Sequence, residues 1–205
     1  MLARPSPKPA PASDGLIELP PGKIAAVATY LEMRTTAPTP STARPLVGRL
    51  ERIAGNLARY RALYARIGEP WLWFSRTILP DHRLRAILEH PAVEAMALVV
   101  EGQDIGLAEL DRRHAGECEL SFFGLVPEAC GQGIGPALMD EAIRRSFARP
   151  IRRLWLHTCT LDHPAAMQFY LKCGFRPFRR AIEIADDPRL TGHMRREAAP
   201  LFPIV

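Results

Sequence analysis

The pattern of apolar and polar residues predicts strands and helices that alternate along most of the chain. Strands are expected where apolar residues occupy every second position or form short β-branched runs. These stretches are Ile24 to Met33, Val93 to Val100, Ile105 to Leu110, Glu117 to Val126, Ile151 to Thr160 and Phe175 to Ile184. Only E-G-Q-D separates the second from the third, which predicts a hairpin.

Helices are expected where apolar residues recur at helical spacing. The longest is predicted from Leu46 to Ile67, with Gly68 ending it. Two shorter helices are predicted from Asp81, as the capping residue, to His90 and from Pro164 to Gly174. The arginines of the long helix are expected on a solvated face, with a nucleic-acid-binding stripe as the alternative: Arg49, Arg52, Arg59, Arg61 and Arg66.

The stretch from Leu120 to Phe147 reads as a strand, a glycine-rich loop and an amphipathic helix. Gly131, Gly133 and Gly135 alternate at the start of that helix. Glycine lets the backbone approach a ligand closely, and the first N–H groups of a helix have no intrahelical partner, so phosphate oxygens fit there. The spacing does not fit a dinucleotide fingerprint or a nucleoside triphosphate loop. A glycine-rich turn without a ligand remains the alternative.

Composition and length indicate one globular domain with a short tail. The chain has 205 residues, of which 47% are hydrophobic and 24% charged, an ordinary soluble balance. Residues 1–15 are rich in Pro, Ala and Ser and predict a disordered tail before a single domain over 16–205, with a loop at Thr35 to Pro45. No apolar run approaches the ~20 residues that cross a bilayer, so no membrane association is expected.

The cysteines and the net charge bear on the compartment and on the class of partner, but not on the activity. The four cysteines form no C-x-x-C pair, and the N-terminus has no secretory signal, which predicts reduced thiols in the cytoplasm. The formal net charge of +5 could suit an acidic partner. The basic residues are scattered without interleaved aromatic residues, so no nucleic-acid partner is expected.

Two segments resemble motifs of the GNAT acetyltransferase superfamily. P-E-A-C-G-Q-G-I-G-P-A-L-M is similar to its acyl-CoA-binding motif, Arg/Gln-x-x-Gly-x-Gly/Ala, and H-P-A-A-M-Q-F-Y-L-K-C-G-F is similar to its N-x-x-A-x-x-F/L-Y-x-K-x-G-F. The order of elements resembles the family over residues 24–184, and motif-level similarity covers 117–175. Cys130 departs from the usual Arg/Gln, and His163 departs from the usual Asn.

The resemblance implies an α/β (α+β) fold with a mixed, mostly antiparallel central sheet flanked by helices. It also implies direct transfer of an acetyl group from acetyl-CoA to a primary amine in a ternary complex, without a metal. A final strand is usual in the family, although residues 186–205 show no strand period. A homodimer stays open. Carried over as contacts of acetyl-CoA are Leu125, Val126, Cys130, Gly131, Gln132, Gly133, Ile134, Gly135, Pro136, His163, Ala166 and Phe169.

Glu119 and Glu117 fall where carboxylate-using members of the superfamily carry the general base. Deprotonating a lysine-like amine of pKa ~10.4 at pH 7 costs about 4.6 kcal/mol, so a raised carboxylate pKa or a relay water is needed. Glu119 is favoured because it lies nearer the acyl end. The period of two places both glutamates on one face with Ser121, which could hold the water, and with Phe123. Solvated or arginine-paired glutamates are the alternative.

The other site expectations also come from the resemblance. Tyr170 would donate a proton to the departing thiolate, with a buried structural tyrosine as the alternative. Leu125 and Val126 would pair through their backbone with the pantetheine arm. Trp71 and Trp73 would wall the acceptor pocket, or simply fill core. Two other functions stay open, a non-catalytic acyl-CoA sensor of the same fold and a macromolecule-interaction protein.

Overall fold

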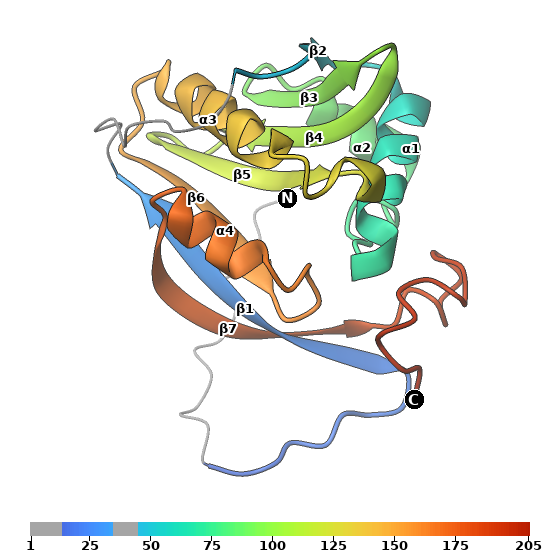
Figure 1. Ribbon diagram of the computed structural model, residues 1–205. Helices are drawn as coiled ribbons and strands as arrows, with labels where there is room; N and C mark the ends of the chain where they lie inside the picture. The colour runs from blue at the N-terminus through green and yellow to red at the C-terminus, as the bar shows by residue number, and fades with distance from the viewer. Residues whose placement is uncertain (1–13, 35–44) are drawn as a thin grey trace.

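The computed structural model describes residues 14–34 and 45–205, and Figure 1 shows its arrangement. The tail predicted over 1–15 and the loop predicted over 35–45 therefore fall almost entirely outside the described residues. In the described part of the chain, strands form a single sheet of order β2-β3-β4-β5-β6-β1-β7. The strands are β1 (Lys23–Met33), β2 (Arg49–Arg52), β3 (Val93–Val100), β4 (Gln103–Asp111), β5 (Glu117–Leu125), β6 (Arg153–Cys159) and β7 (Arg176–Asp186).

The sheet is mixed and mostly antiparallel, because only β5 and β6 pair in parallel. Successive residues of β3 point to opposite faces. Ala95 and Ala97 pack with α1 (Leu57–Gly68) and α2 (Asp81–Leu88), whereas Met96 and Leu98 belong to the core under α3 (Ile134–Phe147) and α4 (Ala166–Lys172). This three-layer arrangement confirms the expected α+β fold. No helix in the described ranges is long and apolar enough to cross a membrane.

The N-terminal strand β1 lies inside the sheet, between β6 and β7 (Figure 1). It pairs with β6 from Ala28 to Met33 and with β7 from Lys23 to Glu32. The chain after β7 forms turns, as its lack of a strand period predicts. A buried pair holds these turns, because Arg189 contacts Asp187 at 2.7 Å and donates to the carbonyl of Phe202. The final strand implied by the family resemblance is therefore absent from residues 187–205.

The helix predicted from Leu46 to Ile67 is wrong in its first half. Residues 49–52 form β2, which pairs with β3, and the helix α1 begins only at Leu57, where the Asn56 side chain accepts a hydrogen bond from the N–H of Arg59. Gly48 separates the two possibilities. Its φ of +90° ends helical continuity, and a Cβ there would lie 2.2 Å from the Val99 carbonyl oxygen. Pairing with a distant strand thus overrides the helical spacing.

The prediction of a solvated arginine face is wrong for Arg59 and Arg61 of α1, whereas Arg66 is exposed as predicted. Arg59 contacts Asp104 at 2.6 Å and Glu51 at 2.8 Å, so it joins the helix to β4 and β2. Arg61 donates to the carbonyl of Leu79 and to Asp81 at 2.8 Å, which ties down the segment before α2. Asp81 is therefore an ion-pair partner, whereas Pro80 occupies the capping position of α2.

The central place of β1 predicts a large stability effect at Leu31, which is completely buried. Leu31→Ala should lower the free energy of unfolding by about 2–5 kcal/mol, because it leaves a cavity between strands far apart in the sequence. Urea denaturation measures this loss. The matched control is Leu16→Ala, at a fully exposed leucine before β1, which should change stability by less than about 0.5 kcal/mol. Equal effects would contradict the central position.

Candidate active site

The parallel pairing of β5 with β6 ends after three residues, and this opens the sheet. Glu117 to Glu119 lie opposite Arg153 to Trp155, after which β6 pairs only with β1 and β5 pairs only with β4. The edge of β5 from Leu120 to Leu125 therefore has no strand beside it among the described residues. Figure 1 shows α3 and α4 on the same side of this opening.

Backbone groups of β5 point into this opening in a regular order. The N–H of Val126 donates to the carbonyl of Ile105 at 2.9 Å. This N–H is therefore not free to pair with the pantetheine arm, which differs from the prediction. Because hydrogen-bonding directions alternate along an antiparallel strand, Leu125 and Phe123 instead direct their backbone groups to the open edge. Sequence reasoning named Leu125 but missed Phe123, because a motif does not state which residues face the neighbouring strand.

The glycine-rich loop presents unpaired N–H groups next to this edge. It follows a 3-10 turn, η2 (Pro127–Ala129), and both Gly131 and Gly133 have a φ of +77°. Open space lies where their Cβ atoms would be, and no side chain caps the start of α3. No described group accepts from the N–H of Gly131, Gly133 or Ile134. This backbone cradle fits the phosphate groups of an acyl-CoA.

The other residues predicted along the loop lie around it. The Gln132 side chain donates to the Glu128 carbonyl at 2.7 Å, and the Cys130 sulfur lies 3.5 Å from the carbonyl oxygen of Val126. Pro136 is within the first turn of α3, where it has no N–H to offer. A Cβ on Gly135 would lie 3.6 Å from the Phe169 ring, so the loop and α4 approach each other there.

A bulge in β5 changes which residues share a face. Glu109 lies opposite Phe122 whereas Leu110 lies opposite Leu120, so Ser121 is the extra residue. Beyond it, Phe122 packs in the core under α1 and Phe123 stacks on Phe169 at 5.6 Å on the other side. The predicted common face of the glutamates with Phe123 is therefore wrong.

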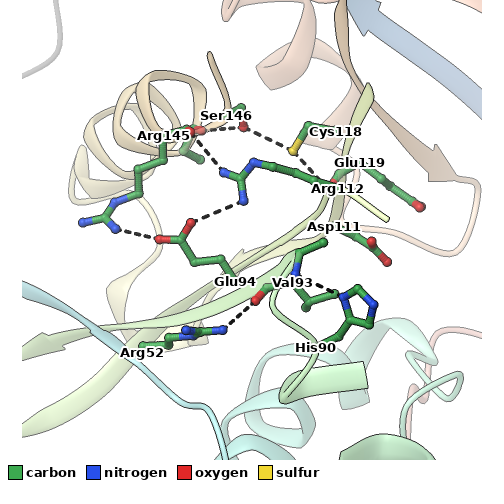
Figure 2. Close-up of polar contacts among 12 residues, drawn as sticks. Arg52, His90, Val93, Glu94, Asp111, Arg112, Cys118, Glu119, Arg145 and Ser146 are labelled. Atoms are coloured by element: carbon green, nitrogen blue, oxygen red, sulfur yellow. Dashed lines mark hydrogen bonds and ion pairs between the residues drawn. The ribbon is translucent and has the colours of Figure 1, made fainter. Parts of the chain in front are cut away.

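Glu119 lies opposite Asp111 on the face covered by α1 and α2. Figure 2 shows both side chains pointing the same way, whereas Arg112 points away toward Glu94. Burial raises the pKa of the Glu119 carboxyl to about 7, with the negative charge of Asp111 adding to the shift and Arg76 opposing it. Glu119 thus changes protonation near neutral pH, as a general base requires.

Glu117 has a different environment. Its carboxylate contacts Arg153 at 3.0 Å, and Arg153 also contacts Glu32 at 3.1 Å. Glu117 is therefore paired with an arginine, which the sequence analysis gave as the alternative to a role as base. The structure therefore separates two residues that the sequence pattern alone leaves equivalent.

Three residues that sequence reasoning missed surround Glu119. Glu109 is fully buried, accepts a hydrogen bond from the Tyr60 hydroxyl and contacts Arg76 at 2.6 Å. The Arg76 guanidinium also lies 4.9 Å from the centre of the Phe122 ring. Asp111 is held by Arg113. The only sequence signal was the spacing of acids in E-L-D at the end of a predicted apolar strand.

A cavity of about 210 Å³ lies at the open edge of β5. The predicted residues Trp71, Trp73, Ser121 and Tyr170 all line it, so the fold brings together segments far apart in the sequence. Glu119 does not line the cavity but precedes Ser121 by two residues on β5. The acidic residues that line the cavity are Asp162 and Glu183, neither of which the sequence singled out.

Asp162 fixes one wall of this cavity. One carboxylate oxygen accepts from the Trp73 indole N–H at 3.0 Å, and the other accepts from the Thr158 hydroxyl and the Cys159 N–H. The Trp73 ring also packs with Phe122 at 5.4 Å. Trp73 therefore fills core and walls the cavity at once. Trp71 packs edge-on with His163, whose Nδ1 accepts from the Ala165 N–H ahead of α4, much as the predicted cap does.

Tyr170 is buried among aromatic rings and has a free hydroxyl. Its ring packs with Phe169 at 5.5 Å and Phe175 at 6.1 Å. No described residue hydrogen-bonds the Tyr170 hydroxyl, and Tyr170 lines the cavity. Burial raises the pKa of Tyr170 well above its usual value, with a further contribution from Asp162. The hydroxyl therefore keeps its proton at neutral pH and can act as a donor.

Comparisons with known proteins agree with the fold. The model of the "Acetyltransferase (GNAT) family" matches residues 58–175. A GCN5-related N-acetyltransferase structure from Sphaerobacter thermophilus is 15% identical with a TM-score of 0.57, covering 79% of this chain and 52% of that one. One from Kribbella flavida is 17% identical with a TM-score of 0.54, covering 83% and 63%. This chain thus spans about half to two thirds of those lengths. No curated protein matches the sequence.

The raised pKa of Glu119 predicts how stability depends on pH. The carboxyl pKa is near 4.5 in the unfolded chain and about 7 in the native state, so ionisation destabilises the native state as pH rises through this window. Glu119→Gln removes that cost, and its stability relative to the wild type should rise by about 1–3 kcal/mol between pH 4.5 and 8.

Urea denaturation at both pH values measures this change. The control is Glu117→Gln, which deprives Arg153 of an ion-pair partner and should give no stabilisation at pH 8. The assignment would be wrong if the two variants behaved alike.

Proposed function

Because the chain belongs to the GNAT acetyltransferase family, we propose that it transfers an acetyl group from acetyl-CoA to a primary amine within a ternary complex. The observation that carries the proposal is the open edge of β5. It leads from a carboxylate of near-neutral pKa to a cradle of unpaired N–H groups. Family membership supports acetyl-CoA as the donor, and the residues around this edge support amine acetylation.

Acetyl-CoA would lie along β5 and end at the glycine loop. The N–H groups of residues 131–135, strengthened by the dipole of α3, would hold its pyrophosphate. Phe123 and Leu125 would pair with its pantetheine arm as an added strand does. Phe169 and Ala166 of α4 would flank the arm, because α4 borders the same opening. His163, just before the start of α4, would contact the cofactor there.

The acceptor amine must lose a proton before it attacks the thioester carbonyl. Glu119 would accept that proton, because its pKa of about 7 suits a base at neutral pH. Ser121 lines the cavity while Glu119 does not, so a water beside the Ser121 hydroxyl would relay the proton. A backbone N–H of the open β5 edge would polarise the carbonyl oxygen as it gains charge.

Tyr170 would assist departure of the thiolate. Its hydroxyl is protonated at neutral pH and has no hydrogen-bond partner among the described residues. It would donate its proton, or a hydrogen bond, to the sulfur as the C–S bond breaks. The role requires a hydroxyl without another hydrogen-bond partner, because such a partner would compete with the sulfur.

The cavity favours a cationic acceptor. The indoles of Trp71 and Trp73 offer π faces, and the carboxylates of Asp162 and Glu183 make the lining electronegative. A protonated amine would be attracted there and then deprotonated toward Glu119. These features favour a positively charged amine but do not distinguish among lysine side chains, protein N-termini, polyamines and small amine drugs.

Thiol release from acetyl-CoA with a panel of amines tests the proposal directly. Release that depends on an amine supports acetyl transfer. Binding of CoA by calorimetry without any release would instead indicate the non-catalytic sensor. Absence of both binding and a CoA-induced rise in melting temperature would favour the macromolecule-interaction protein.

Tyr170→Phe should lower kcat by about a hundredfold and leave the Kd for CoA within about twofold, because it removes a donor used only when the thiolate departs. Steady-state kinetics and calorimetry measure the two quantities. A parallel loss of affinity and turnover would assign Tyr170 a structural role.

The pH profile should identify the base. In the wild type, kcat/KM should rise with pH along a limb of apparent pKa about 7, because only ionised Glu119 accepts a proton. Glu119→Gln should lower kcat/KM about a hundredfold and remove this limb. Glu117→Gln is the matched control and should keep it, and a limb that survives in Glu119→Gln would assign the base elsewhere.

Gly133→Ala should weaken CoA binding by at least about tenfold. A Cβ disfavours the φ of +77° and so misdirects the N–H groups of the cradle. The matched control is Gly102→Ala in the turn between β3 and β4, where φ is also +77° and the surroundings are equally open. Both variants should lose similar stability, so an equal loss of affinity would contradict the cradle.

A further inference from the structure

Strand β7 forms an unprotected edge of the sheet. It is eleven residues long, pairs with β1 on its inner side and has no described strand on its outer side (Figure 1). Ile182 is 61% exposed and Ile184 53% exposed, and Ile182 lies opposite Val27, which is 44% exposed. A long edge strand beside exposed apolar side chains is a template for pairing with another strand.

The backbone of β7 offers regular hydrogen-bonding groups to this edge. The N–H of Asp187 donates to the carbonyl of Gly22, which fixes the residues that bond inward toward β1. By the alternation of an antiparallel ladder, Glu183 and Ala181 also bond inward. Ile182 and Arg180 therefore direct their N–H and C=O groups outward, to the free edge.

The charges of β7 are complementary to the same strand turned around. If two β7 strands pair antiparallel about Ala181, Arg179 lies opposite the partner's Glu183, and Arg180 lies opposite the partner's Ile182. Arg179 and Glu183 would then form a non-hydrogen-bonded pair, in which side chains come closest. A two-fold axis at Arg180 would set that residue against itself, and an axis at Ile182 would set Arg179 against an alanine.

We propose that β7 is a homodimer interface, in which two copies of this chain pair antiparallel about Ala181 and continue one sheet across both molecules. The two-fold symmetry repeats each Arg179–Glu183 pair, and it makes the apolar faces of Val27 and Ile182 in the two copies parts of one continuous sheet face. This inference rests on the edge strand and does not require the proposed function.

The interface also reaches the active site. Glu183 lines the cavity of its own copy, and the partner's Arg179 would lie beside that carboxylate. Arg179 of each copy would thereby offset the negative charge of Glu183 in the cavity of the other copy. The dimer is thus expected to influence which amines bind, in addition to satisfying the free backbone groups of β7.

Charge reversal tests the register. The wild-type protein should be a dimer by analytical ultracentrifugation at micromolar concentration. Arg179→Glu alone and Glu183→Arg alone each set like charges together twice, so each should weaken dimerisation by at least about tenfold. An equimolar mixture of the two single variants should form a heterodimer, because both pairs across its axis are again opposite in sign.

Two further measurements complete the test. Circular dichroism should show an unchanged fold in both single variants, since Arg179 and Glu183 are exposed. The melting temperature should fall, because the dimer no longer stabilises the native state and because Arg179→Glu also removes the cation–π contact with the Tyr30 ring. Ile182→Pro removes an outward N–H and should also give monomers. A wild type that is monomeric at all concentrations would overturn the proposal, as would single variants that remain dimeric, or a mixture that stays monomeric. A tail or another protein would then cover this edge.

Discussion

The early end of pairing between β5 and β6 is the constraint on which the site depends. Two parallel strands that separate after three residue pairs leave backbone groups without partners, and such groups are costly unless water or a ligand satisfies them. The proposed path of acetyl-CoA and the cavity proposed for the acceptor both lie at this opening. Strand β1 pairs with the other side of β6 from Leu154 to Cys159, so β6 continues in the sheet after β5 has separated from it.

The bulge at Ser121 places unlike chemistry on the two faces of β5. On one face, burial first and the negative charge of Asp111 second raise the pKa of the Glu119 carboxyl to about 7. On the other, Phe123 stacks on Phe169 beside Tyr170. If Ser121 took a regular place in the ladder, the alternation of faces would turn Phe122 away from the core under α1. The face that Glu119 shares with Phe122 therefore depends on a single irregularity in the ladder.

The position of β1 links the fold to both the cavity and the proposed interface. Ile24 and Ala26 of β1 line the cavity together with Glu183 and Ala185 of β7. The opposite face of the same two strands carries the exposed Val27 and Ile182. The two paired strands thus line the cavity with one set of side chains and leave the alternate set on the surface, as the period of two requires.

The sequence by itself determined what depends on neighbours along the chain: most strands, the glycine cradle before α3, and the motif residues Glu119 and Tyr170. Tertiary structure alone decided what depends on distant partners. Residues 49–52 became a strand because β3 accepts them, and Asp111 and Asp162 gained roles from side chains far away in the sequence. Local pattern carries no information on which strand lies beside which, and that adjacency sets pKa values, open edges and cavities.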